Sequence, residues 1–136
     1  GNYDKLPKEA VKSLERTLET TKGNTGLQFN IALNYGGRNE ILRAVKKIAM
    51  KVEEGILKAD EITERDIADN LYTSGIPDPD LLIRTSGEMR LSNYLLWQSA
   101  YSEFVFTDVL WPDFTRKDFE NAIEIFQHRK RRFGGR

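Results

Sequence analysis

Apolar and polar positions recur with two different periods along the chain, and these periods predict its helices and strands. Val11, Leu14 and Leu18 recur at helical spacing and predict a first helix. We expect this helix to begin at Pro7, because proline suits a first helical position, and to stop at Gly23. The chain therefore opens with an amphipathic helix.

Strict alternation replaces the helical period in the stretch GLQFNIALN. One side of this stretch is apolar and consists of Leu27, Phe29, Ile31 and Leu33. Alternation of this kind is typical of a half-buried strand, so we expect a strand over residues 27–34. The adjacent Gly36 and Gly37 break it.

Two further helices are predicted before the middle of the chain. The apolar residues of the longer one are Ile41, Val45, Ile48 and Val52, with Gly55 as its stop. Thr63 and Asp66 have the spacing of a capping box. They predict a short helix that runs through Ile67 and Leu71.

The second half of the chain continues to alternate strands with helices. We expect strands at residues 81–83 and 104–106, a helix capped by Ser92 or Asn93 that runs through Trp97 and Tyr101, and a last amphipathic helix over residues 119–126. This order predicts one α/β domain over residues 1–136, with a mostly parallel sheet flanked by helices. In such sheets, ligands bind beyond the carboxyl ends of the strands.

Composition excludes several classes of protein. The chain has 136 residues, and its 21 basic and 21 acidic residues balance, which gives no support for nucleic-acid binding. It contains no cysteine, which excludes disulfides and thiol catalysis. It has no apolar run of about 20 residues, as a membrane span requires, and its start does not resemble a signal peptide. We therefore expect a soluble, cytoplasmic protein.

Polar residues follow the first predicted strand, from Asn34 to Arg38. The two glycines between them let backbone approach a ligand closely, and the helix that follows attracts anions at its start. An ordinary strand-to-helix turn, with Arg38 paired to Glu40 or a neighbour, explains the same residues. Both interpretations stay open at this point.

Polar residues also follow the second predicted strand. Arg84 stands at its tip, and Arg90 and Ser92 follow across a Ser-Gly turn. Two guanidinium groups that converge from a short loop suit a diphosphate, because its oxygens accept paired hydrogen bonds. The alternative is that Ser92 caps a helix while the arginines pair with acidic residues, namely Glu88, Glu103 or Asp108.

Other reactive side chains carry less weight. Glu103 could face the arginine loop, or it could form a salt bridge with one of its arginines. His128 lies in a basic stretch without a partner at catalytic spacing, and no Ser-His-Asp set is evident.

Four stretches together resemble the second half of the cis-prenyltransferase family, and within it the bacterial undecaprenyl diphosphate synthases. They are LNYGGRNEI, PDLLIRTSGEMRLSNYLLWQSAYSE, FTDVLWPDF and RRFGG. The resemblance implies condensation of isopentenyl diphosphate, with cis geometry, onto an allylic diphosphate such as farnesyl diphosphate. The product would be undecaprenyl diphosphate, the lipid that carries cell-wall sugars. It also implies a homodimer, Mg²⁺ at the diphosphates and peripheral membrane contact through the lipid product.

The resemblance assigns roles by position. The residues that match the isopentenyl diphosphate site are Arg84, Arg90, Leu91 and Ser92. Glu103 matches a carboxylate linked to magnesium. Arg132 and Gly134 match a tail that reaches the neighbouring subunit's site, and Asn34 and Arg38 are expected near the substrate without a firm role.

The chain departs from the family's pattern in two ways. Met89 stands where some relatives have a histidine credited with metal contact, and a thioether is a poor magnesium ligand. The family's DGNGRW and SENW segments, which belong to its amino-terminal half, do not occur. We therefore expect a carboxyl-terminal portion that holds no catalytic residue and is inactive alone. The alternative is a non-catalytic partner subunit or a plain anion-binding module.

Overall fold

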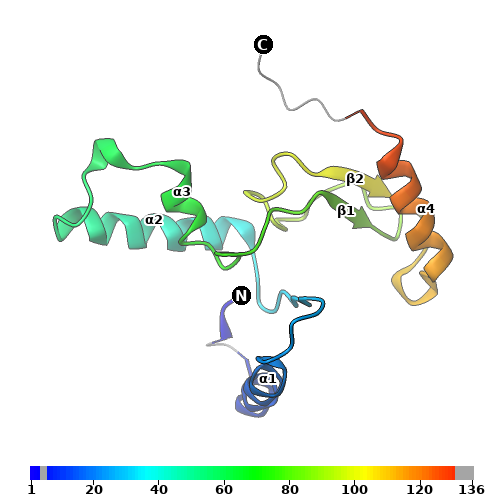
Figure 1. Ribbon diagram of the computed structural model, residues 1–136, viewed down its shortest axis with the longest axis horizontal. Coiled ribbons are helices and arrows are strands. Elements are labelled where there is room, and N and C mark those ends of the chain that lie inside the picture. Colours follow the sequence, from blue (N-terminus) through cyan, green and yellow to red (C-terminus); the bar gives the residue numbers. More distant parts are fainter. Residues whose placement is uncertain (4–5, 131–136) are drawn as a thin grey trace. The chain divides into compact units, whose positions relative to one another are not determined.

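The computed structural model describes residues 1–3 and 6–130 of the chain. It contains two compact units, Gly1–Tyr72 and Thr73–Arg136, whose elements are labelled in Figure 1. The expectation of a single domain over residues 1–136 stays a prediction.

The first unit is helical. Its elements are α1 (Lys8–Thr21), α2 (Gly37–Glu53), the 3₁₀ turn η2 (Ala59–Glu61) and α3 (Glu64–Ala68). Pro7 is the N-cap of α1 rather than its first residue, and the helix ends two residues before Gly23. α1 has no buried residue, and Leu18 of its apolar stripe is 62% exposed.

The buried face of α2 differs from the predicted one. Its buried residues recur every three to four positions and are Gly37, Glu40, Ala44 and Ile48. Val45, one of the apolar residues whose spacing predicted this helix, is 48% exposed. α3 packs against α2, and small residues permit such close approach between helices. The apolar pattern therefore located the helix, and its contacts decided which face is buried.

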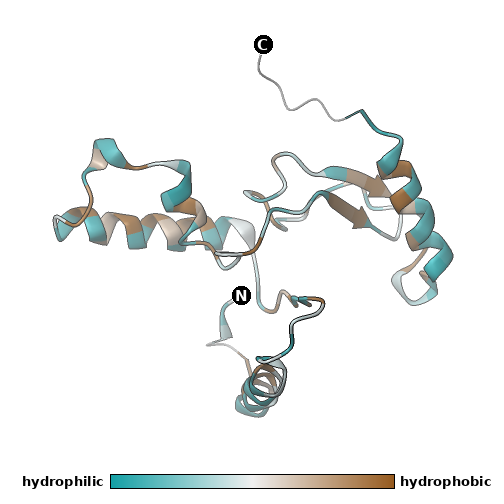
Figure 2. Ribbon diagram, in the orientation of Figure 1, coloured by the Kyte–Doolittle hydropathy of each residue, from teal (hydrophilic) through white to brown (hydrophobic). Residues whose placement is uncertain are grey.

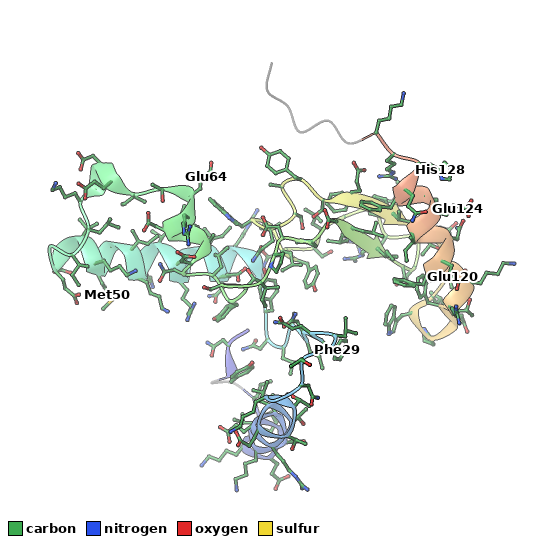
Figure 3. The ribbon with its side chains drawn as sticks, viewed as in Figure 1. Phe29, Met50, Glu64, Glu120, Glu124 and His128 are labelled. Carbon is green, nitrogen blue, oxygen red and sulfur yellow. The ribbon has the colours of Figure 1, made fainter. Side chains whose placement is uncertain are left out.

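Residues 27–34 do not form a strand, so this prediction was wrong. The alternating residues Leu27, Phe29 and Ile31 are instead 93%, 80% and 58% exposed; Phe29 is labelled in Figure 3. A strand exists only when its backbone pairs with a neighbour, and no strand among the described residues pairs with this segment. Local alternation was present without the partner that strand formation requires.

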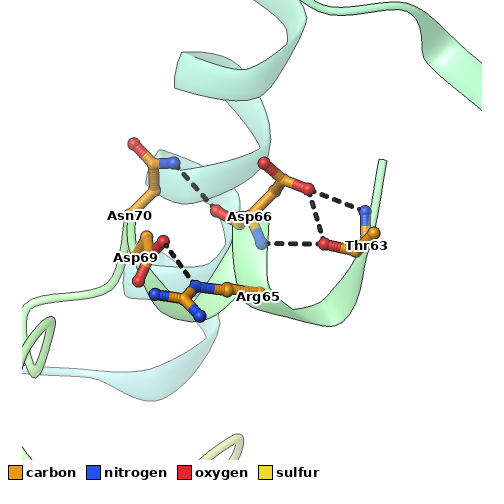
Figure 4. Close-up of polar contacts among 5 residues, drawn as sticks. All are labelled: Thr63, Arg65, Asp66, Asp69 and Asn70. Atoms are coloured by element: carbon orange, nitrogen blue, oxygen red, sulfur yellow. Dashed lines mark hydrogen bonds and ion pairs between the residues drawn. The ribbon is translucent and has the colours of Figure 1, made fainter. Parts of the chain in front are cut away.

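The capping box predicted for α3 is confirmed (Figure 4). The Asp66 carboxylate accepts from the Thr63 amide at 2.8 Å and from its hydroxyl at 2.7 Å. These hydrogen bonds lower the pKa of Asp66, because they favour the charged carboxylate. Asn70 donates to the Asp66 carbonyl oxygen at 2.8 Å. α3 itself ends at Ala68, three residues short of the predicted end.

The second unit contains the sheet. Its elements are β1 (Leu81–Arg84), β2 (Glu103–Phe106), the 3₁₀ turn η3 (Trp111–Asp113) and α4 (Arg116–Gln127). The two strands are parallel, as predicted, and pair from Leu81 opposite Glu103 to Arg84 opposite Phe106. α4 packs on β2, and Figure 2 shows the apolar strand residues in brown. The expectation of parallel strands flanked by helices is thereby met.

No helix forms between residues 92 and 101, so the helix predicted there was wrong. Ser92, Asn93 and Leu95 have φ angles of 48°, 64° and 44°. Such left-handed angles are incompatible with a right-handed α-helix. The segment forms consecutive turns instead, and they bring Gln98 and Ser99 into the interior.

α4 begins with a second capping box, between Thr115 and Asp118. The Asp118 carboxylate accepts from the Thr115 amide at 2.8 Å and from its hydroxyl at 2.5 Å. These bonds lower the pKa of Asp118. Across residues 1–3 and 6–130, no helix has both the length and the apolarity that crossing a membrane requires.

Candidate functional site

The loop that follows β1 is tied to the residues that follow β2. The Ser86 amide donates to the Val109 carbonyl oxygen at 2.9 Å, and the Gly87 amide donates to that of Thr107 at 2.9 Å. The Thr107 amide donates in turn to the Arg84 carbonyl oxygen at 3.0 Å. The carboxyl ends of the two parallel strands therefore meet at one edge, with the start of the arginine loop held in place.

A tight turn at Ser86 and Gly87 directs this loop. Their φ angles are 69° and 68°, in the left-handed region that favours glycine. A Cβ atom at position 87 would also lie 3.0 Å from Asp108 Oδ1. The turn thus depends on Gly87, and it carries the chain from Arg84 toward Arg90.

The two predicted arginines have different surroundings. Arg84 is the last residue of β1 and is half-buried, whereas Arg90 is exposed and forms an ion pair with Glu88. This pairing was the alternative left open for Arg90. Exposed ion pairs contribute only about 0–1 kcal/mol, so a polyanion can compete with Glu88 for the guanidinium group. The pair is therefore compatible with an anion site.

Leu91 and Ser92 follow in turns rather than at a helix start. Leu91 is half-buried and accepts from the Tyr94 amide at 3.0 Å, while Ser92 is exposed. Because no helix follows Ser92, it does not act as an N-cap, and no helix N-terminus adds amide donors here. That part of the sequence interpretation was wrong. The hydroxyl of Ser92 is still on the same loop as Arg90.

Glu103 lies away from the tip of β1. It pairs with Leu81 at the beginning of the ladder, whereas Arg84 pairs with Phe106 at its end. Three residues of strand separate these positions by about 10 Å. Phe104 and Phe106 stack with ring centroids 6.1 Å apart, so Glu103 lies on the other face of β2. The two strands alone therefore do not bring Glu103 and Arg84 together.

Arg129 is the partner of Glu103, and the sequence interpretation missed it. Its Nη1 donates to Glu103 Oε2 at 2.8 Å. The Arg129 amide also donates to the Phe126 carbonyl oxygen at 3.1 Å, which fixes the end of α4 beside the pair. A separation of 26 residues leaves no local sequence signal for this contact.

The first unit contains the other predicted residues. Asn34 has a φ of 45°, and its Nδ2 donates to the Asn2 carbonyl oxygen at 2.8 Å. Arg38 is exposed near the start of α2. Glu40, the alternative partner for Arg38, is fully buried and accepts from the Tyr35 hydroxyl at 2.5 Å and the Tyr72 amide at 2.7 Å. Roles near a substrate for Asn34 and Arg38 stay predictions.

Arg132 and Gly134, the predicted inter-subunit tail, lie outside the described residues. Met89 is 75% exposed.

The donor chemistry of Glu103 suits magnesium. Mg²⁺ in phosphate-binding sites takes one or two carboxylates together with substrate phosphates and water. The described part of the chain holds no cluster of three or more histidine, aspartate or glutamate side chains arranged for a metal. The role of Glu103 as a magnesium ligand stays a prediction.

Comparisons with known proteins agree on one family. The sequence model described as "Putative undecaprenyl diphosphate synthase" matches residues 1–134. The isoprenyl transferases of Halalkalibacterium halodurans and Geobacillus kaustophilus are 56% and 57% identical to the chain over 135 residues. These alignments cover 99% of this chain and 53% and 52% of the relatives. The chain thus spans about half the length of these relatives.

Solved structures contain the same arrangement. Lavandulyl diphosphate synthase from Lavandula x intermedia, in complex with dimethylallyl diphosphate, superposes with a TM-score of 0.96 at 42% identity. A probable undecaprenyl diphosphate synthase from Campylobacter jejuni superposes with a TM-score of 0.83 at 36% identity. The superpositions cover 99% of this chain and 58% and 61% of those proteins. The chain belongs to the undecaprenyl diphosphate synthase family of prenyltransferases.

Proposed function

We propose that this chain carries the isopentenyl diphosphate half of a cis-prenyltransferase site. The whole enzyme would condense isopentenyl diphosphate onto farnesyl diphosphate and produce undecaprenyl diphosphate for the cell-wall carrier lipid. One observation carries the proposal: Arg84 stands at the carboxyl tip of a parallel strand, followed by Arg90 on a loop tied to the neighbouring strand. The family membership supports it, and so does a similar protein solved with an allylic diphosphate.

The proposed site binds by charge and geometry. Arg84 and Arg90 would each offer a planar fork of N–H donors to diphosphate oxygens, and Ser92 would donate its hydroxyl. The backbone of Leu91 would hold these two residues in register. When bound, Mg²⁺ would neutralise diphosphate charge, with Glu103 as its carboxylate ligand in this chain.

A half site does not suffice for the reaction. Positioning two substrates supplies much of the rate enhancement in such chemistry, and the DGNGRW and SENW segments that the family uses for the allylic diphosphate do not occur here. We therefore expect no polyprenyl synthesis by this chain alone. The same proposal includes a homodimer for the whole enzyme, a tail at Arg132 and Gly134 that reaches the neighbouring subunit, a cytoplasmic location and membrane contact through the product.

Titration calorimetry with isopentenyl diphosphate and Mg²⁺ tests the site. Arg84→Ala and Arg90→Ala should each weaken binding about tenfold or more, because hydrogen bonds to charged groups contribute about 1.5–3 kcal/mol. Arg116→Ala is the matched control, since it removes an arginine whose exposed partner, Glu120, lies on the same helix. Equal binding by the unmodified chain and all three variants would refute the diphosphate assignment.

The same titration distinguishes half of a cis-prenyltransferase site from a non-catalytic anion-binding module. Glu103→Gln should weaken binding only when Mg²⁺ is present, whereas a plain anion site should respond equally with and without the metal. No contact in the described residues favours the non-catalytic alternative, so we propose the enzyme half.

A further inference from the structure

One face of α2 carries three cationic side chains beside a surface hollow. Lys46 and Lys47 follow Arg43 by about one helical turn, so these three residues, the α2 cluster, lie next to one another. The hollow has a volume of about 570 Å³. Its lining is completed by Asn39, Met50 (labelled in Figure 3), Tyr72 and residues 1–3. All of these residues belong to the first unit, so the hollow lies within one compact part of the chain.

No acidic side chain compensates the α2 cluster. None of its members forms an ion pair within residues 1–3 and 6–130, and no described acidic residue lines the hollow. Lys51, on the same helix, differs from the cluster in having an acidic neighbour. The pKa of Asp66 is lowered first by hydrogen bonds from Thr63 and further by the charge of Lys51. Like charges one turn apart destabilise a helix, and the described residues do not offset this cost at the cluster.

The first member of the cluster is held in place by its own unit. The Arg43 Cζ lies 4.5 Å from the ring centroid of Tyr72, and Arg43 Nη1 donates to the Asn70 carbonyl oxygen at 3.1 Å. Tyr72 is fixed in turn, because its amide donates to the carboxylate of the fully buried Glu40 at 2.7 Å. A guanidinium group has five N–H donors, so most of those of Arg43 stay available. A ligand that binds a fixed side chain loses less conformational entropy.

The donor set suits a phosphate group. Arginine offers a planar fork that matches two phosphate oxygens, and lysine adds a compact charge with rotatable donors. The side chains of Lys46 and Lys47 are exposed, and their ammonium groups have no hydrogen-bond partner in the described part of the chain. Both can therefore reach a ligand beside Arg43. A metal cation does not suit the hollow, because its described lining has three positive side chains and no carboxylate.

We propose that Arg43, Lys46 and Lys47 form a second binding site, for a phosphate group, in addition to the site proposed at Arg84 and Arg90. The two sets of side chains belong to different units, so this proposal does not depend on the proposed function. A dissolved phosphate ion and the phosphate of a lipid headgroup share the chemistry that the α2 cluster recognises.

Titration of the isotope-labelled chain with inorganic phosphate, followed by two-dimensional NMR, tests the site. The amide resonances of residues 43–47 should shift and saturate, whereas potassium chloride at equal ionic strength should not produce this response. Lys46→Gln and Lys47→Gln should each weaken phosphate binding about tenfold, because each removes a charged donor. Lys51→Gln is the matched control, with the same substitution on the same helix outside the hollow, and should change binding by less than about twofold.

Two further changes separate the guanidinium fork and the amino terminus from simple charge. Arg43→Lys retains the positive charge but loses the paired donors and the stacking on Tyr72, so phosphate should bind about fivefold more weakly. Acetylation of the amino terminus of Gly1, which also lines the hollow, should change binding by less than about twofold. Circular dichroism of Lys46→Gln and Lys47→Gln should match that of the unmodified chain, because both side chains are exposed.

Vesicles identify the source of the phosphate group. Co-sedimentation with phosphatidylglycerol vesicles but not with phosphatidylcholine vesicles, reduced by Lys47→Gln, would assign the site to an anionic lipid headgroup. A saturable NMR response to inorganic phosphate without co-sedimentation would assign it to a dissolved phosphate. Either result supports a phosphate site at the α2 cluster.

Three results would overturn the proposal. One is the absence of a saturable response at residues 43–47, even where residues 84–92 respond, because only the proposed function would then stand. Another is equal weakening by Lys47→Gln and Lys51→Gln, which indicates an effect of overall charge without a site. The third is loss of binding on acetylation of Gly1, because the amine would then hold the anion instead of the three side chains.

Discussion

The ion pair between Glu103 and Arg129 connects the start of β2 to the end of α4, and its loss should destabilise the second unit measurably. Both residues have fixed backbones: the Glu103 amide donates to the Asp80 carbonyl oxygen at 2.9 Å, and the Arg129 amide donates to that of Phe126 at 3.1 Å. Ordering the pair therefore costs less side-chain entropy than for two residues on free loops. Glu103→Gln, Arg129→Gln and the double variant form the test.

The surroundings set the expected size of the effect. The side chains of Arg129 and Glu103 are 39% and 25% exposed, and the donor–acceptor distance is 2.8 Å. Exposed pairs contribute about 0.2–1 kcal/mol, and a hydrogen bond to a charged group contributes about 1.5–3 kcal/mol. For this partly exposed pair we expect a coupling energy of about 1 kcal/mol. It should decrease with added salt, because the exposed part is screened.

Urea unfolding followed by tryptophan fluorescence measures this coupling energy, because the signal comes from the compact unit that contains the ion pair. The two tryptophans of the chain, Trp97 and Trp111, both lie in Thr73–Arg136. The exposed pair between Arg116 and Glu120, on one helix, is the matched control. Its coupling should be about 0.3–0.5 kcal/mol, as for other helical pairs four residues apart.

The reasoning fails if the double-mutant cycle for Glu103 and Arg129 gives the same coupling energy as the cycle for Arg116 and Glu120. Anchoring between distant residues would then add nothing to an ordinary surface pair. The reasoning also fails if Arg129→Gln alone leaves the urea midpoint unchanged.

Two further predictions concern buried and capping carboxylates. Glu40→Gln should lower the free energy of unfolding by about 1–3 kcal/mol, because the amide cannot accept at every position that the buried carboxylate fills, including the Tyr72 amide. Far-UV circular dichroism during urea unfolding measures this, and an effect no larger than that of the exposed Glu54→Gln would contradict it. The pKa of Asp118 is lowered by its hydrogen bonds to Thr115, so its stabilising contribution is fully present above its ordinary value of 3.8 and is lost as pH falls through the lowered value. Asp118→Asn should therefore lower the urea midpoint of the second unit at neutral pH. The urea midpoint of this variant should also fall less than that of the unmodified chain as the pH is lowered. An equal fall in both proteins would contradict a stabilising role of the Asp118 carboxylate.

Elements with local determinants could be predicted from the sequence. The capping boxes at Thr63 and Thr115 depend on a residue three positions away, although only the first was predicted. β1 and β2 have short apolar runs that a following polar loop ends. The arginines of the candidate site were identified because Arg84 ends such a strand and Arg90 lies in the polar loop that follows it.

Elements that need a distant partner could not be predicted in the same way. Residues 27–34 have the alternation of a strand, but a strand requires a neighbour, and none of the described residues supplies one. Residues 92–101 have helical spacing, but left-handed angles at Ser92, Asn93 and Leu95 prevent a helix. In both cases the local pattern was real and the contacts of the chain decided otherwise.

The sequence by itself determined the family, the positions of α1, α2, α3 and α4, the parallel strand pair and the residues of the arginine loop. These features depend on motifs and periodicities of neighbouring positions. Only the tertiary structure decided that Glu40 of α2 is fully buried, that Glu103 pairs with Arg129, and that Glu103 and Arg84 lie at opposite ends of the strand ladder. These facts depend on strand register and helix packing, which join residues 20 or more positions apart. Spacing along the chain does not encode such distances.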